Sequence, residues 1–255
     1  MKVYDLPEGS RSSKGTSIIN LIDLDTDEKI TSILTYGKQS QAKYLFMCTG
    51  WGIVKKTKIE DFAHIRRSGM IAIELENKDE LAWVRLTKGT DNLIIVTDKG
   101  SSIKFTEKDI RPMGRSARGV IGIKLGSGTK VIAADIVDQS GFLLIVSDKG
   151  FGKKTQLGDW PVQKRAGLGV KAAEVTSRNG NLVAATILKK EDKTLMITSN
   201  LGQVIKLPIK EIPILKRQTQ GVILMRLSDP KDKISSITTL VKEAKGSKEE
   251  TKLVF

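Results

Sequence analysis

The sequence predicts an all-β fold of four-stranded units arranged like the blades of a propeller, in about five repeats of 48–54 residues. First, a glycine recurs at positions 15, 69, 119, 169 and 221, at intervals of 50 to 54 residues. Second, each copy contains short β-branched runs separated by turn residues, whereas helix caps and helical apolar stripes are scarce. Four-stranded units of this length are typical of propeller-like arrays, in which neighbouring units bury each other's apolar faces.

Residues 92–138 show the pattern of one repeat. Two strand-like runs flank the turn signal Asp-Lys-Gly, which predicts a hairpin. A basic loop and two further apolar runs follow. In order, the expected elements are strand 92–97, turn 98–100, strand 101–106, basic loop 111–118, strand 120–125 and strand 131–136.

The other copies keep this order. Their first strands are expected at 44–48, 142–146 and 195–198, and their last strands at 29–35, 81–86, 182–188 and 234–240. A Gly-x-x-x-Lys signature marks each hairpin, at Gly52/Lys56, Gly100/Lys104, Gly150/Lys154 and Gly202/Lys206. We expect these glycines to adopt positive φ angles in the turns, because a side chain would be penalised there.

The first copy is incomplete. Lys2 aligns with Lys56, so the first strand of its hairpin is missing. Either the sequence is cut within a repeat or another segment supplies the strand. We expect one domain over 1–240 and a polar tail over 241–255, in which residues 252–255 could form a closing strand.

The charge balance indicates an anionic partner. The chain has 43 basic and 29 acidic residues, a net charge of +14 and an isoelectric point near 9.7. Nucleic acid is the leading candidate, and a merely lysine-rich protein is the alternative. The single cysteine, Cys48, lies in an apolar run and indicates a buried thiol in a reducing compartment. No membrane segment or signal peptide is recognisable, so we expect a cytoplasmic protein.

The sequence contains none of the familiar residue patterns that support catalysis. No nucleophile–base arrangement, Walker loop or metal cluster is recognisable, and the sole histidine, His64, is interpreted as a loop residue. We therefore expect no enzymatic activity and no cofactor in this chain.

The basic loops are the candidate functional site. In four copies an arginine stands four residues before the recurring glycine, and around Gly69 it stands three residues before. Equivalent loops around a propeller would place phosphate-binding charges at regular intervals, which suits a bent duplex held through its backbone. The candidate DNA-binding residues are Arg11, Lys14, Arg66, Arg67, Arg111, Arg115, Arg118, Lys164, Arg165, Lys216 and Arg217 in the loops, with Lys55, Lys56, Lys104, Lys153, Lys154 and Lys206 in the neighbouring hairpins. Trp51, Trp83 and Trp160 share no repeat position, so core or loop packing is expected rather than base stacking.

These repeats resemble the C-terminal domain of the A subunit of bacterial type IIA topoisomerases, DNA gyrase and topoisomerase IV. The resemblance covers residues 1–240, through segments such as Lys-Val-Tyr-Asp-Leu-Pro (2–7), Ser-Ile-Ile-Asn-Leu-Ile (17–22) and Gly-Arg-Ser-Ala-Arg-Gly-Val-Ile-Gly-Ile (114–123). It implies a β-pinwheel, a propeller variant whose blades exchange strands, with duplex DNA wrapped around its basic perimeter.

The resemblance also implies partners. These are double-stranded DNA, the catalytic region of the A subunit and the ATPase B subunit, in the bacterial cytoplasm at the nucleoid. ATP and Mg²⁺ would act elsewhere in that holoenzyme, as would the cleavage tyrosine, because Tyr4, Tyr36 and Tyr44 do not lie in its sequence context.

One difference from the gyrase A sequences leaves two topoisomerase roles possible for this chain. Gyrase A subunits carry the box Gln-Arg-Arg-Gly-Gly-Lys-Gly in the first blade, and its nearest counterpart here is Gln-Lys-Arg-Ala-Gly-Leu-Gly at 163–169, in a later repeat. A gyrase-like role in supercoiling is expected if the box lies upstream, and a topoisomerase IV-like role in relaxation and decatenation if it is absent. A third alternative, of another class, is a protein-interaction scaffold whose basic rim meets an acidic protein.

Overall fold

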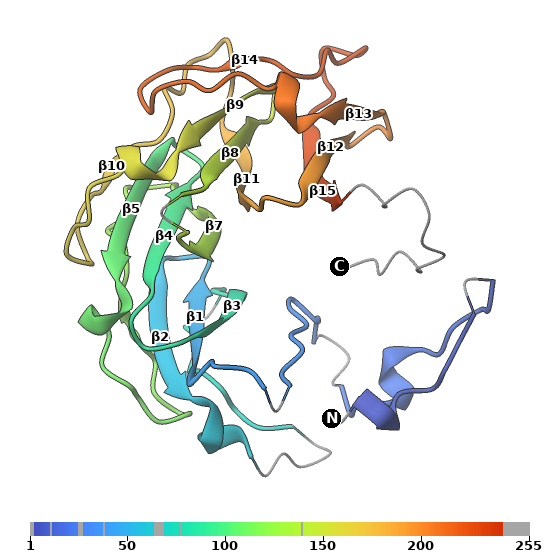
Figure 1. The fold of residues 1–255 in the computed structure, drawn as a ribbon, viewed down its shortest axis with the longest axis vertical. Coiled ribbons are helices and arrows are strands. Elements are labelled where there is room, and N and C mark those ends of the chain that lie inside the picture. The colour runs from blue at the N-terminus through green and yellow to red at the C-terminus, as the bar shows by residue number, and fades with distance from the viewer. Residues whose placement is uncertain are drawn as a thin grey trace.

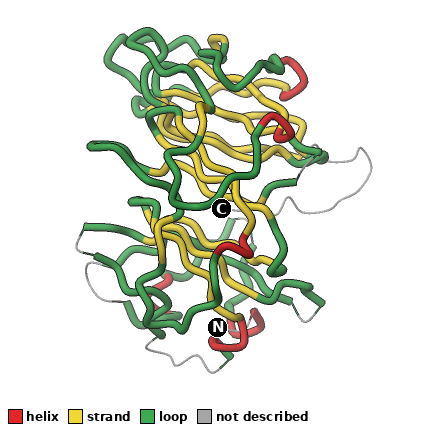
Figure 2. Tube along the Cα trace, turned by 90° about the vertical axis from the view of Figure 1, so that its left-hand side faces the viewer, coloured by secondary structure: helices red, strands yellow, loops and turns green. Residues whose placement is uncertain are grey.

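The computed structural model describes residues 3–10, 12–24, 28–37, 39–63, 69–76, 78–138 and 140–241. Within these ranges the only helices are short 3-10 turns, and the strands form four antiparallel sheets, which confirms the predicted all-β class. Figure 1 shows the sheets side by side along an arc that is open on one side. In Figure 2 the strands of the successive sheets are stacked in layers, and loops lie along their edges.

Strand exchange links the sheets. Each of the first three sheets takes three strands from one repeat and a short fourth strand from the following repeat, in the orders β3-β1-β2-β6, β10-β5-β4-β7 and β11-β8-β9-β14. The strands are β1 (Tyr44–Thr49), β2 (Ile53–Lys58), β3 (Leu81–Thr87), β4 (Asn92–Thr97), β5 (Ser101–Thr106), β6 (Val120–Ile121), β7 (Val131–Ile136), β8 (Phe142–Ser147), β9 (Phe151–Gln156), β10 (Val170–Lys171), β11 (Leu182–Leu188) and β14 (Val222–Ile223).

The last sheet has three strands, in the order β13-β12-β15. They are β12 (Asp192–Ser199), β13 (Val204–Pro208) and β15 (Ile234–Val241). Among the described residues no strand pairs with the outer edge of β13, the edge that in the other sheets receives the exchanged strand.

A 3-10 turn follows the second hairpin strand of each complete repeat. These turns are η3 (Ile59–Phe62), η4 (Glu107–Asp109), η5 (Leu157–Asp159) and η6 (Ile209–Glu211), and the first repeat contributes η1 (Val3–Asp5) and η2 (Ile18–Asn20). The turns η4, η5 and η6 direct the chain from the hairpin into the basic loop that follows.

The recurring glycines make the strand exchange possible. Val120, Val170 and Val222 pair with Val54, Ser102 and Gly152 of the preceding sheet. The glycine before each exchanged strand has a positive φ, and at Gly169 (φ 76°) a Cβ atom would lie 2.3 Å from the carbonyl oxygen of Ser102. Only glycine permits this approach of two backbones.

The hairpin glycines also adopt the predicted conformation. Gly52, Gly100, Gly150 and Gly202 have φ angles of 77°, 80°, 80° and 84°. In the first three, the turn packs against the segment that follows the exchanged strand; at Gly150, for example, a Cβ atom would lie 2.2 Å from the carbonyl oxygen of Met225.

The hydrophobic core lies between adjacent sheets. One cluster joins β1 and β2 to β4 and β5, with Phe46, Leu93 and Phe105 fully buried. Two further clusters repeat this arrangement along the arc, around Trp160 and around Leu195. Because each cluster draws on two sheets, no sheet buries its apolar face without a neighbour.

Three sequence-based expectations differ from the structure. Residues 28–37 form no strand, so the strand expected at 29–35 is wrong; the described residues of the first repeat contain no hairpin on which it would pair. The strand expected at 120–125 ends at Ile121, because Gly122 turns the chain toward Gly52 and places Ile123 in the core. The tail from 242 and the closing strand 252–255 lie outside the described residues.

Candidate nucleic-acid interface

The three basic loops that are fully described occupy equivalent places. We call residues 111–119, 161–169 and 213–221 the edge loops. Each runs along the second hairpin strand of the preceding sheet, and each begins with a backbone hydrogen bond to the lysine of the Gly-x-x-x-Lys signature. The donors and acceptors are Met113 N to Lys56 O (2.8 Å), Gln163 N to Lys104 O (2.7 Å) and Leu215 N to Lys154 O (2.9 Å).

Successive edge loops are also joined to each other. Lys124, which follows the first edge loop, donates its amide to the carbonyl of Gly167 in the second, at 2.9 Å. Glu174 donates in the same way to Thr219 in the third, at 3.2 Å. The three edge loops therefore form one continuous strip along the arc, with a basic segment in each of three successive repeats.

The arginines of the second and third edge loops are partly engaged in structural hydrogen bonds. Arg165 is half-buried and donates from Nε to the carbonyl of Asp109 and from Nη1 to the carbonyl of Ile121, both at 3.0 Å. Arg217 makes the equivalent pair of contacts one repeat later, at 2.9 and 2.8 Å. A guanidinium has five N–H donors, so donors are left for an external anion.

The remaining loop cations are more accessible. Lys14, Arg111, Arg118, Lys164 and Lys216 are exposed, as is Lys206 on β13, and Arg115 is half-buried. Arg118 forms ion pairs with Glu74 and Glu76, and Lys216 lies 3.4 Å from Asp159. An open hollow of about 350 Å³ lies between Asp159, Lys216, Arg217 and Gln218. Three further candidates, Arg11, Arg66 and Arg67, lie outside the described residues, as does His64.

Five hairpin lysines do not face solvent. Lys55, Lys56, Lys104, Lys153 and Lys154 have relative exposures between 0% and 9%, so they do not add exposed charge to the strip as expected. The next repeat covers the face on which each would have been exposed. These five side chains therefore do not form part of the exposed strip.

The signature lysines bind the next repeat instead. Their Nζ atoms donate to the carbonyl of the first residue of the following 3-10 turn: Lys56 to Glu107 (2.8 Å), Lys104 to Leu157 (3.1 Å) and Lys154 to Ile209 (2.9 Å). Burial lowers the pKa of all three ammonium groups. On β13 no following turn is described, and Lys206 is exposed.

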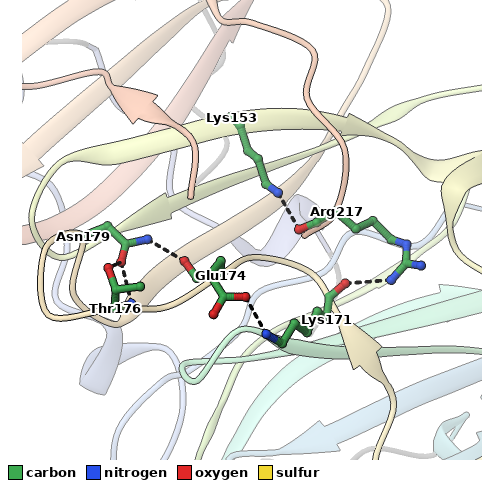
Figure 3. A network of polar contacts seen from close by, with 6 residues as sticks. All are labelled: Lys153, Lys171, Glu174, Thr176, Asn179 and Arg217. Carbon is green, nitrogen blue, oxygen red and sulfur yellow. Dashed lines mark hydrogen bonds and ion pairs between the residues drawn. The ribbon is translucent and has the colours of Figure 1, made fainter. Parts of the chain in front are cut away.

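Lys55 and Lys153 reach the edge loops themselves. Lys153 Nζ donates to the carbonyls of Lys216 and Arg217, and Figure 3 shows the latter contact at one end of a polar network. Lys55 Nζ donates to the carbonyls of Ala72 and Arg115. Burial lowers the pKa of each lysine to about 8, and at Lys153 the charge of Arg217 contributes.

Sequence reasoning missed the basic residues that follow the glycine. Lys124, Lys171 and Arg226 are exposed and lie in or next to the exchanged strands. Lys124 and Arg226 both stand five residues after their recurring glycine, at 119 and 221. This shared spacing after the glycine is the sequence pattern from which the two residues could have been predicted.

The described residues hold no cluster of metal-binding side chains. Cys48 is buried, as predicted, and burial and the nearby Asp79 raise the pKa of its thiol above the usual range. Trp160 is buried in the core and donates from Nε1 to Ser102 Oγ at 2.6 Å, which confirms its predicted packing role. In the part of the chain that the structure covers, we find no helix with the length and apolarity to cross a membrane.

The sheets that exchange strands, with a basic loop in each repeat, define a propeller-like protein of the strand-exchanging type. A family model described as "DNA gyrase C-terminal domain, beta-propeller" matches residues 1–36, 43–88, 91–138, 141–189 and 193–240. The chain belongs to this family, as its repeats predicted.

Relatives with similar sequence are DNA gyrase A subunits. The chain is 40% identical to that of Salmonella typhimurium over 229 residues, which is 90% of this chain and 26% of the relative. It is also 40% identical to that of Staphylococcus aureus over 246 residues, 95% of this chain and 27% of the relative. The chain thus spans about a quarter of the length of these relatives.

Two solved structures share the fold. One is the C-terminal domain of DNA topoisomerase IV, with a TM-score of 0.84 and 23% identity over 94% of this chain and 74% of that one. The other is the DNA gyrase A C-terminal domain, with a TM-score of 0.76 and 24% identity over 90% of this chain and 76% of that one.

Proposed function

We propose that this domain binds duplex DNA with little regard to sequence and bends or wraps it along the strip of edge loops. The observation that carries the proposal is the recurrence of exposed cations, such as Arg111, Lys164 and Lys216, in loops that are hydrogen-bonded into one strip. Charges repeated along a curved edge match the repeated phosphates of a bent duplex.

The energetics favour a contact shared by several repeats. Bending a stiff duplex costs on the order of 1–6 kcal/mol per 20–30 base pairs, so a single loop could not offset it. The net charge of +14 supplies the long-range attraction. Proposed phosphate contacts are Arg11, Lys14, Arg66, Arg67, Arg111, Arg115, Arg118, Lys164, Arg165, Lys206, Lys216 and Arg217, together with Lys124, Lys171 and Arg226.

The family suggests the context of this binding. We infer that the domain serves supercoiling or relaxation by a type IIA topoisomerase, in the bacterial cytoplasm at the nucleoid. Its partners would be the catalytic region of the A subunit and the ATPase B subunit. In that assembly this domain would be non-catalytic, with no cofactor of its own, and strand cleavage and ATP hydrolysis would occur elsewhere.

A topological assay tests the proposal. The domain is bound to nicked circular DNA, the nick is ligated, the protein is removed and the linking number is measured. A shift that grows with protein concentration would support a chiral wrap of the gyrase type, and its sign would give the hand. Binding without a shift would favour bending of the topoisomerase IV type. Absence of binding at low salt would overturn the proposal in favour of a protein-interaction scaffold.

A further inference from the structure

The side chain of Lys153 is fully enclosed between two repeats. It lies on β9, and its Nζ atom donates three hydrogen bonds to the edge loop of the following repeat. It donates to Lys216 O at 2.7 Å, to Arg217 O at 2.6 Å and to Thr219 Oγ1 at 3.1 Å. An ammonium group has three protons, so each of them has an acceptor in this loop.

Lys55 holds the equivalent position on β2. Its Nζ atom joins two loops, since it donates to Ala72 O at 2.6 Å and to Arg115 O in the next repeat. In both cases the captured carbonyl belongs to the arginine that stands four residues before the recurring glycine. The lysine therefore fixes the backbone from which that arginine extends.

The sheet between them shows that this position does not require a lysine. Ile103 occupies it on β5, is fully buried and packs under the second edge loop, where its Cδ1 atom lies 3.5 Å from the Cβ position of Gly167. An apolar residue is thus sufficient for packing. A buried ammonium is costly to desolvate, so its presence at 55 and 153 calls for a role beyond packing.

The contacts continue from Lys153 toward the surface. Arg217, held by its carbonyl, donates from Nη1 to the carbonyl of Lys171, and Lys171 pairs with Glu174 (Figure 3). The buried Asn179 in turn donates from Nδ2 to the carbonyl of Glu174 at 2.8 Å. The buried Lys153 is thus connected through Arg217 to the exposed Lys171, which pairs with the half-buried Glu174.

We propose that Lys55 and Lys153 are positioning residues of the DNA interface, whose ammonium groups hold the first and third edge loops so that Arg115 and Arg217 face the duplex. This inference rests on the proposed function.

Protonation of the two buried lysines should be coupled to DNA binding. The charged groups around Lys153 Nζ are Arg217 and, on the same loop, Lys216, which is paired with Asp159. A phosphate at Arg217 would offset the positive charge and favour the protonated lysine. Binding should therefore take up protons near the pKa of about 8, and affinity should fall as the pH rises through that value.

The test compares Lys55→Met/Lys153→Met with the wild type on a mixed-sequence duplex, at constant salt and at pH values on both sides of 8. The wild type should lose affinity as the pH rises. The double variant should bind roughly fivefold to tenfold more weakly at neutral pH, because hydrogen bonds from a charged donor are lost, and its affinity should be nearly independent of pH over this range. Ile103→Met, in the same position of the middle sheet, is the control and should keep the wild-type profile.

A second readout needs no DNA. In Lys153→Met the amides of residues 213–221 should exchange with solvent faster, while those of 161–169 should not change. If Lys153→Met fails to fold, the same measurements can be made on Thr219→Val. This variant removes one acceptor but leaves the lysine in place, so smaller effects are expected. A wild type that binds no duplex would overturn the proposed function alone. Unchanged exchange together with an unchanged pH profile in the variants would overturn the positioning role.

Discussion

The Nζ atom of Lys153 lies 2.6 Å from the carbonyl oxygen of Arg217, a residue of the following repeat. A cation inside one repeat thereby supports a cation at the surface of the next. The same relationship joins Lys55 to Arg115. Because the contact crosses from one repeat to another, the geometry of the basic strip depends on how adjacent sheets are packed.

Charge reversal in the edge loops should weaken DNA binding without unfolding the domain. Arg111 and Lys164 are exposed residues of the first and second edge loops. For Arg111→Glu/Lys164→Glu we expect lower affinity for a mixed-sequence duplex, and a plot of log affinity against log salt that is less steep by about two, since each cation would neutralise one phosphate. The matched control is Lys189→Glu/Lys190→Glu, the same charge change on exposed residues between β11 and β12. Equal losses in both double variants would point to net charge alone.

Replacing Gly169 should destabilise the strand exchange. Gly169 has a φ of 76°, and a Cβ atom would lie 2.3 Å from the carbonyl oxygen of Ser102. We expect Gly169→Ala to lower the free energy of unfolding by roughly 1–3 kcal/mol, measured by urea denaturation. Gly114→Ala is the control, because nothing lies within 4 Å of its Cβ position. A stable Gly169→Ala protein would contradict the observed approach of the two backbones.

The free energy of unfolding should rise with pH above about 8. Burial lowers the pKa of Lys55 and Lys153 from 10.5 to about 8. Between these values the unfolded chain binds more protons than the folded one, so raising the pH favours the folded state. Urea denaturation at a series of pH values should show this rise in the wild type and a smaller rise in Lys55→Met/Lys153→Met. Equal slopes would mean that the two lysines titrate normally in the folded protein.

The thiol of Cys48 should be unreactive in the native protein. It is fully buried, and burial raises the pKa of the thiol, so the reactive thiolate is scarce. We expect no colour with Ellman's reagent under native conditions and one equivalent of reaction in denaturant. Rapid labelling of the folded protein would show that β1 is open to solvent.

Local sequence predicted the long strands well. The expected bounds of 92–97, 101–106, 131–136 and 182–188 coincide with β4, β5, β7 and β11. Such strands are specified by β-branched runs and by glycine turns, both of which are local signals. The repeated glycines likewise predicted positive φ angles, because the conformation depends on a single residue.

The partners of the short strands could not be derived in this way. Val120 and Ile121 pair with β2 of the preceding repeat, and nothing in two residues specifies which sheet they join. The burial of the hairpin lysines could not be predicted either, because it also depends on contacts with the next repeat. Lys153 and Lys154 are neighbours on one strand and were expected to be exposed, but both are buried, because side chains on opposite faces are covered by different parts of the next repeat.

Strand exchange also has a consequence for synthesis on the ribosome, where the chain emerges from its N-terminus. The sheet that contains β1, β2 and β3 is completed only when Val120 and Ile121 have been translated, and each later sheet waits in the same way for the repeat that follows it. Folding during translation should therefore lag behind elongation by one repeat. Until then the newest sheet exposes the unpaired edge of its second hairpin strand, and this exposed edge passes from β2 to β5 and then to β9 as translation proceeds.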